Sequence, residues 1–215
     1  MRVLEFCGTP GCGKTTLSNQ LQSELIAKGY DAKNYNELKG SKVKELFHFM
    51  FKKGFISTCC NLMTVMGMVN RDRFVYGIKI AIVCYQINEW SQAGKADYLL
   101  FDEGIIQYIT TLSHGKAISK LDKLPSRLKP LYEECDTFVV DCKVDIVTNI
   151  TRLTQRGNVK DRFVIDDEDK QKEALKLKEN NIQAVISYFA PSNLVQIDTA
   201  NESALNDVIS FAVKG

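Results

Sequence analysis

Residues 8–15 constrain the fold of this chain more than any other stretch. They read Gly-Thr-Pro-Gly-Cys-Gly-Lys-Thr, which matches the spacing G-x-x-x-x-G-K-[ST]. An apolar segment at 3–7 leads directly into them, and a pattern typical of a helix begins at Lys14. A strand, a glycine-rich turn and a helix in this order are the context that a phosphate-binding loop requires. The stretch therefore predicts an α/β fold with an anion site after its first strand.

The chemistry of this loop follows from its backbone. Glycines permit a tight turn in which successive N–H groups face one concavity, and the next helix adds donors and a positive dipole end. Lys14 is expected to reach the β- and γ-phosphates of ATP, and the Thr15 hydroxyl to coordinate Mg²⁺. We therefore expect ATP and Mg²⁺ as cofactors. The loop residues expected to bind the nucleotide are Gly8, Pro10, Gly11, Cys12, Gly13, Lys14, Thr15 and Thr16.

The composition is that of an ordinary globular protein and narrows the classes of function. With 215 residues, 45% of them hydrophobic and 25% charged, the chain suits a single domain spanning 1–215. A net charge of +2 gives no indication of a nucleic-acid partner. The chain opens directly into a strand, so no secretory leader is expected. Its seven cysteines are therefore expected to be reduced thiols of a cytoplasmic protein.

Residues 54–70 carry no charge, but they do not suggest a membrane protein. A membrane-spanning helix needs about 20 strongly apolar residues, and this run is shorter and contains polar residues. We expect a buried helix here, although the apolar character of 43–69 would also suit a homodimer helix. Four phenylalanines nearby form either part of the core or the wall of a pocket for a flat ring: Phe47, Phe49, Phe51 and Phe55.

Strand and helix patterns alternate along the chain, which predicts a parallel sheet covered on both faces. We expect a five-stranded parallel sheet in a three-layer α/β/α sandwich of the P-loop NTPase class, with the first strand at its centre. The expected strands are 3–7, 31–37, 97–101, 137–141 and 194–198. The expected helices are 14–28, 41–51, 54–70, a long helix from about 74 to 93, 144–156, 166–189 and 202–213.

Adjacent carboxylates, Asp102 and Glu103, follow the apolar strand at 97–101. In open α/β sheets the functional rim lies at the carboxyl ends of the strands. An acid at this position, downstream of a phosphate-binding loop, is typical of the Walker-B residue that holds Mg²⁺, usually through water. Many strands end in Asp, so this interpretation depends mainly on the phosphate-binding loop upstream. Asp102 and Thr15 are the expected metal residues.

Arg152 and Arg156 lie four residues apart near the end of the helix expected at 144–156. This spacing puts both cations on one helical face, where they repel each other unless an anion lies between them. Gly157 follows as a candidate hinge, so we expect an arginine-bearing lid over about 152–165. The alternative is a basic helix end, which the helix dipole favours in any protein.

The acceptor side is expected over about 41–75. Glu37 falls where the second strand should end, and is a candidate base or acceptor-binding residue. Arg71 and Arg73 stand at the start of the long helix, where the dipole disfavours cations. That position favours a ligand role for these arginines, with a solvated ion pair as the alternative.

These motifs resemble those of the nucleoside and nucleotide kinases among P-loop proteins, and of thymidylate kinases and deoxynucleoside kinases in particular. The segment 70–73 resembles the arginine segment that touches the acceptor's phosphate in thymidylate kinases. The run 137–156 resembles their strand, helix and arginine-bearing lid. The segment 197–200 resembles the loop that packs on the adenine of ATP, which implies Thr199 and Ala200 as further nucleotide-binding residues.

The resemblance implies transfer of the ATP γ-phosphoryl group to a small-molecule acceptor, a nucleoside or nucleoside monophosphate in the first place. Lys14, Arg152 and Arg156 would stabilise the charge in transit. Glu37 would accept the acceptor's proton, with Glu103 as the reserve candidate. The sequence departs from the pattern of these kinases at two positions on the acceptor side. Leu38 replaces the proline that follows the acidic residue, and the arginine usual after Asp102 is absent.

Two other functions stay open. The departures and the aromatic segment keep a kinase of a sugar, an antibiotic or a cell-envelope precursor in view. A nucleotide-dependent ATPase or switch protein is the second alternative. Arginines within the chain itself and the lack of an NKxD guanine motif argue against a switch.

Overall fold

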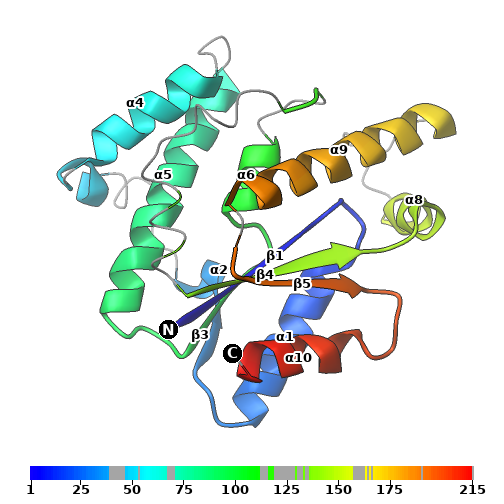
Figure 1. The fold of residues 1–215 in the computed structure, drawn as a ribbon, viewed down its shortest axis with the longest axis horizontal. Helices are drawn as coiled ribbons and strands as arrows, with labels where there is room; N and C mark the ends of the chain where they lie inside the picture. Colours follow the sequence, from blue (N-terminus) through cyan, green and yellow to red (C-terminus); the bar gives the residue numbers. More distant parts are fainter. Residues whose placement is uncertain are drawn as a thin grey trace.

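The protein is organised around a central parallel sheet, seen edge-on in Figure 1. The structure, a computed structural model, describes residues 1–38, 47–52, 54–66, 71–111, 116–118, 129, 133, 136–156, 163, 165, 167–189 and 191–214, without the side chains of 61–66, 71–76, 91 and 214. Five parallel strands form the sheet in the order β2-β3-β1-β4-β5. The strands are β1 (Arg2–Gly8), β2 (Ala32–Asn34), β3 (Tyr98–Phe101), β4 (Thr137–Lys143) and β5 (Asn193–Asp198). The expected central position of the first strand is confirmed.

Helices cover both faces of the sheet, which confirms the predicted three-layer α/β/α sandwich (Figure 1). Two of them, α1 (Lys14–Ala27) and α10 (Ala204–Lys214), pack on one face. The opposite face is covered by α5 (Arg71–Gln92), α6 (Ile105–Thr111) and α9 (Glu168–Phe189), with α4 (Phe55–Met66) outside α5. Two further helices in the described part of the chain are α2 (Tyr35–Leu38), after β2, and α8 (Ile146–Gln155), after β4.

The alternation of side chains along β1 divides the core in two. Leu4 and Phe6 pack in the cluster beneath α1 and α10, whereas Val3 and Cys7 pack in the cluster beneath α5, α6 and α9. A strand buried on both faces is the normal pattern in a parallel sheet. Because β1 lies between β3 and β4, the loop that follows it opens at the centre of the sheet's carboxyl edge.

The second strand is shorter than its sequence pattern indicates, and this corrects the expected setting of Glu37. β2 ends at Asn34, and Glu37 lies instead in the short helix α2. The Asn34 side chain hydrogen-bonds to Ser18, at 3.3 Å, and to Asn19 and Gln22, all on α1. Tyr35 then stacks on Phe101 with ring centroids 4.6 Å apart. These side-chain contacts anchor the turn to α1 and β3 and end the strand early.

The helix α6 has no counterpart among the predicted elements. The expected helix at 41–51 lies largely outside the described residues, although 47–50 are helical. Most of 113–135 also lies outside them. In the part of the chain that is described, none of the helices is long and apolar enough to cross a membrane.

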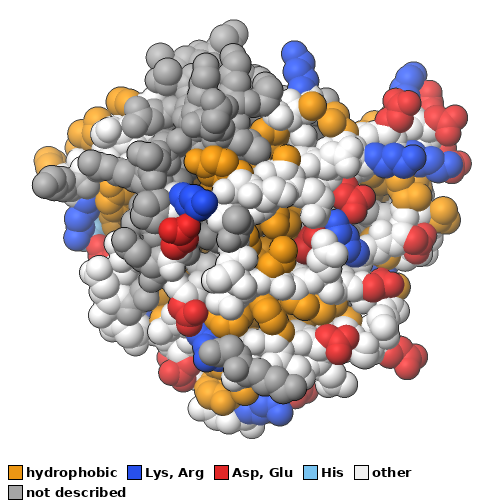
Figure 2. All heavy atoms as spheres, in the orientation of Figure 1, with side chains coloured by type: hydrophobic (Ala, Val, Ile, Leu, Met, Phe, Trp, Pro, Cys, Tyr) orange, Lys and Arg blue, Asp and Glu red, His pale blue; other side chains and the backbone are white. Residues whose placement is uncertain are grey.

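A helix is present where the pattern at 54–70 predicts one, and its side chains are described over 55–60. α4 buries Phe55, Thr58 and Cys59, but Ile56 is 58% exposed, and Phe51, just before α4, is 84% exposed. Figure 2 shows hydrophobic side chains at this edge of the molecule. On the described part of the face drawn there, acidic and basic side chains are interspersed.

Candidate functional site

The glycine-rich loop connects β1 to α1 and takes a backbone shape that only glycine adopts without strain. Gly8, Gly11 and Gly13 have φ angles of 150°, 87° and 92°, a region that side chains disfavour. Gly13 caps α1 without a side chain, so the first-turn N–H groups stay available to an anion. The Lys14 ammonium folds back over the loop and donates to the carbonyl oxygens of Gly8 and Thr9, at 2.9 Å each.

Thr15 and Asp102 come together at the carboxyl edge of the sheet. The Thr15 hydroxyl donates to the Asp102 carboxylate at 3.2 Å. Phe101, one residue earlier, pairs in register with Glu5 of β1, which brings the end of β3 beside the loop. A hydroxyl and a carboxylate are the hard oxygen ligands that Mg²⁺ prefers, usually completed by water and phosphate. Among the described residues there is no cluster of three or more His, Cys, Asp or Glu side chains for a metal ion.

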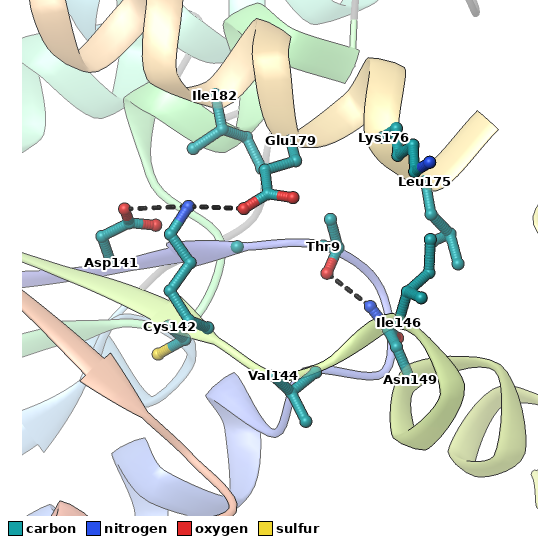
Figure 3. Close-up of a pocket in the computed structure, with 12 residues that line it drawn as sticks. Thr9, Asp141, Cys142, Val144, Ile146, Asn149, Leu175, Lys176, Glu179 and Ile182 are labelled. Atoms are coloured by element: carbon teal, nitrogen blue, oxygen red, sulfur yellow. Dashed lines mark hydrogen bonds and ion pairs between the residues drawn. The ribbon is translucent and has the colours of Figure 1, made fainter. Parts of the chain in front are cut away.

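The helix α8 is docked directly on the loop, as Figure 3 shows for Asn149 and Thr9. Asp145 caps α8 by accepting from the N–H groups of Val147 and Thr148. One turn later the Asn149 amide donates to the Thr9 hydroxyl at 2.6 Å. A Cβ on Gly11 would lie 2.4 Å from Asn149 Oδ1, so the two segments touch only because residue 11 has no side chain.

A pocket of about 660 Å³ lies beside the loop, between α1, the end of α8 and the segment that follows β5. Both predicted arginines, Arg152 and Arg156, line it, together with Gly11, Gly13 and Thr16. The volume is in the range of small-molecule sites, about 300–1,000 Å³. The structure therefore brings the arginine pair and the loop to one cavity.

Thr199 joins this pocket from the loop after β5. Its hydroxyl donates to the carbonyl oxygen of Cys12 and lies 3.4 Å from an Arg152 guanidinium nitrogen. Ala200 does not line the pocket; its N–H donates to the Asp198 carboxylate at 2.9 Å. The pocket also has lining residues that sequence reasoning missed: Leu17, Gln20, Gln155, Asn201, Glu202, Ala204 and Leu205. Helical spacing offered one signal, because Gln20 lies one turn beyond Thr16 on α1.

The structure places Glu37 away from the loop. The Glu37 carboxylate accepts from the Gln22 amide at 2.7 Å. Gln22 lies eight residues beyond Lys14 on α1, which is about 12 Å along the helix axis. Glu103 is exposed beside Asp102. The Arg71 and Arg73 side chains, and residues 157–162 and 164 of the lid expected at 152–165, lie outside the described residues.

Cys12 is fully buried within the loop. A hydrogen bond from the Cys142 thiol, with the nearby Lys14 ammonium, lowers the pKa of Cys12 from 9.0 to about 6. The same hydrogen bond and burial raise the pKa of Cys142. These neighbours favour the charged form of Cys12, although burial opposes it.

A second, smaller cavity lies behind the loop, between β4, α8 and α9 (Figure 3). Its volume is about 50 Å³, which suits one or two water molecules rather than a nucleotide. Lys143 lines this cavity, and its ammonium nitrogen lies 3.3 Å from Asp141 Oδ2 and 2.9 Å from Glu179 Oε1. Asp141 Oδ1 and Asn149 Oδ1 are buried there without a hydrogen-bond partner among the described residues.

Together, the sheet order, the loop and the arginine helix define an α/β protein of the P-loop type. No protein-family model and no curated protein sequence matches the chain. Among solved structures, the YorR protein of Bacillus subtilis in complex with phosphorylated GDP is 15% identical. That match covers 96% of this chain and 93% of YorR, with a TM-score of 0.51.

Two further solved structures resemble the chain. A deoxyadenosine kinase from M. mycoides with bound dCTP is 15% identical over 100% of this chain and 99% of its own, with a TM-score of 0.49. A shikimate kinase from Acinetobacter baumannii in complex with shikimate is 13% identical over 97% and 88%, with a TM-score of 0.45. Of these matches, the one to YorR supports the fold.

Proposed function

We propose that the protein is an ATP- and Mg²⁺-dependent phosphotransferase that moves the ATP γ-phosphoryl group to a small-molecule acceptor. A nucleoside or nucleoside monophosphate is the first candidate acceptor. The observation that carries the proposal is the pocket of about 660 Å³ shared by the loop glycines, Arg152, Arg156 and Thr199. A triphosphate that lies along the loop would extend its nucleoside into this pocket.

Each donor-side residue has a separate task in this proposal. Lys14, now paired with two carbonyl oxygens, would exchange them for the β- and γ-phosphate oxygens. Thr15 and Asp102 would hold Mg²⁺, which supplies charge neutralisation between the phosphates when it is bound. Arg152 and Arg156 come from the chain itself and would stabilise the charge on the phosphoryl group in transit. The task of the protein is mainly positioning and electrostatics, as phosphoryl transfer requires.

The acceptor half of the proposal rests on fewer contacts. Glu37 and Glu103 are the candidate bases, and Arg71 or Arg73 would grip a phosphate on the acceptor. The contact of Glu37 with Gln22 favours Glu103, which follows Asp102 directly. A kinase of a sugar, an antibiotic or a cell-envelope precursor is retained as the alternative, because Glu103 stands where related kinases carry an arginine.

The deciding experiment measures ATP turnover against a panel of nucleosides, nucleoside monophosphates and sugars. Release of ADP should rise with one acceptor class and should vanish in Lys14→Ala. If the rate of ADP release does not change with any acceptor but rises with a protein partner, the protein is a switch protein instead. Substantial turnover by Lys14→Ala would refute the assignment of the loop.

The cellular setting and the assembly belong to the same proposal. We propose a cytoplasmic enzyme that forms a homodimer through the exposed apolar side chains near α4. Phe47, Phe51 and Ile56 are 59%, 84% and 58% exposed, more than isolated surface hydrophobics require. Sedimentation of the wild type and of Phe51→Ser tests this part, with a monomeric wild type as the refuting result.

A further inference from the structure

Glu5 is a buried carboxylate in the middle of the central strand, and none of the roles above uses it. Its exposed fraction is 2%, in a strand whose other interior side chains are apolar. Glutamate is almost never fully buried unless it is paired, because burial of an unpaired charge is unfavourable. Glu5 Oε1 accepts a hydrogen bond from the Ile106 N–H at 2.6 Å. The contact reaches from β1 to the start of α6, just beyond the Asp102 turn.

Gly104 makes this approach possible. A Cβ on residue 104 would lie 2.4 Å from Glu5 Cδ and 2.6 Å from Glu5 Oε1. The Glu5 carboxylate thus fills the space that a side chain at 104 would need. Neither Glu5 nor Gly104 belongs to a sequence pattern typical of metal or phosphate ligands.

The turn 102–104 is held at its start by backbone pairing between β1 and β3, and at its end by the Glu5 side chain. At its start, Phe101 pairs in register with Glu5 itself. At its end, Gly104 packs on the Glu5 carboxylate and Ile106 donates to it. Asp102, which accepts from Thr15 at 3.2 Å, lies between these two points. The Glu5 carboxylate thus contacts the turn on the side that follows Asp102.

We propose that Glu5 is a positioning residue for Thr15 and Asp102, the two residues that would hold Mg²⁺, and that Gly104 is its obligatory partner. Glu5 touches neither nucleotide nor metal; it fixes the turn so that Asp102 stays against Thr15. The inference rests on the proposed function, because it assigns the pair to the Mg²⁺ of a bound nucleotide. Outer residues that orient metal ligands typically change metal affinity by about 10- to 100-fold when they are mutated.

The test is a double-mutant cycle read by the Mg²⁺ concentration that half-saturates ATP binding, measured by calorimetry at fixed ATP. Gly104→Ala and Glu5→Ala should each raise that concentration by about tenfold. The double variant should be no worse than Glu5→Ala, because the smaller side chain leaves room for the new methyl group. Losses that multiply in the double variant would overturn the proposal.

Two controls separate positioning from a general loss of stability. Leu25→Ala removes a fully buried side chain of α1 and should lower the unfolding temperature without changing the Mg²⁺ requirement. Glu5→Gln keeps the side-chain volume and the acceptor oxygen, so it should stay close to wild type even if Glu5→Ala does not fold. An equal Mg²⁺ requirement in Leu25→Ala and Glu5→Ala, or a loss in Glu5→Gln, would refute the role of Glu5. A wild type that binds ATP with Mg²⁺ but phosphorylates nothing would refute the transfer reaction alone, and the titration would still decide this inference.

Discussion

Gly11→Ala is the sharpest test of how the phosphate loop is supported. Gly11 has a φ of 87°, where a side chain adds about 1–2 kcal/mol of strain. The new Cβ would also lie 2.4 Å from Asn149 Oδ1 and 3.0 Å from Leu153 Cγ. Overpacking of this kind adds about 1–3 kcal/mol. We expect the free energy of unfolding to fall by the sum of these effects.

The chain contains a matched control for this substitution. Gly29 has a φ of 88°, and a Cβ there meets nothing within 4 Å. Gly29→Ala should therefore show the strain of about 1–2 kcal/mol without the clash, and should bind ATP as the wild type does. In Gly11→Ala the loop must move away from α8, which disturbs the ring of N–H donors. We expect ATP affinity to fall by about tenfold or more, equivalent to about 1.4 kcal/mol.

Chemical denaturation and calorimetric titration with ATP measure the two effects separately. The difference in unfolding free energy between Gly11→Ala and Gly29→Ala isolates the contact with α8. Equal destabilisation in the two variants, with equal ATP affinity, would show that α8 does not press on the loop as described.

Three further predictions address the chemistry of the site. Arg152→Ala should lower kcat far more than ATP affinity, because Arg152 would stabilise charge that develops on the phosphoryl group during transfer. Stopped-flow and binding assays measure the two effects separately. A loss of affinity alone would show that the assignment of Arg152 to the lid is wrong. Because the pKa of Cys12 is lowered to about 6, its contribution to stability should be complete above about pH 9 and fade as the pH falls through 6. Ultraviolet titration of wild type against Cys12→Ser reports the thiolate, and no titration near pH 6 would contradict the contact with Cys142. Of the two acids, Glu103→Gln should lower kcat more than Glu37→Gln in acceptor-dependent assays, and the reverse order would restore Glu37 as the base.

Local patterns predicted the elements that surround the donor site. The strand–loop–helix unit, the apolar strand before Asp102 and the helix with Arg152 and Arg156 all appear where the sequence indicates them. Each has a short-range signature: glycines where φ is positive, apolar residues in a buried strand, or cations at helical spacing. The central position predicted for β1 agrees with its burial on both faces.

The same reasoning was wrong where side chains from distant segments decide the outcome. β2 ends at Asn34 because three side chains of α1 bind it, and no local signal at 31–37 reveals those partners. Glu37 accordingly turns toward Gln22 instead of ending a strand. α6 was missed because its 7 residues are too few for a helical period to stand out.

The sequence by itself determined the glycine-rich loop between a strand and a helix and the residues that form it, and it predicted that a metal-binding acid and an arginine pair accompany the loop. These are properties of spacing, and spacing can be read along one dimension. Only the tertiary structure decided what holds the loop in shape. Asn149 meets Gly11, and Glu5 meets Gly104, across separations of about a hundred residues or more in the chain. In both pairs a polar side chain fills the volume that glycine leaves empty, and such complementarity exists only after the segments have packed.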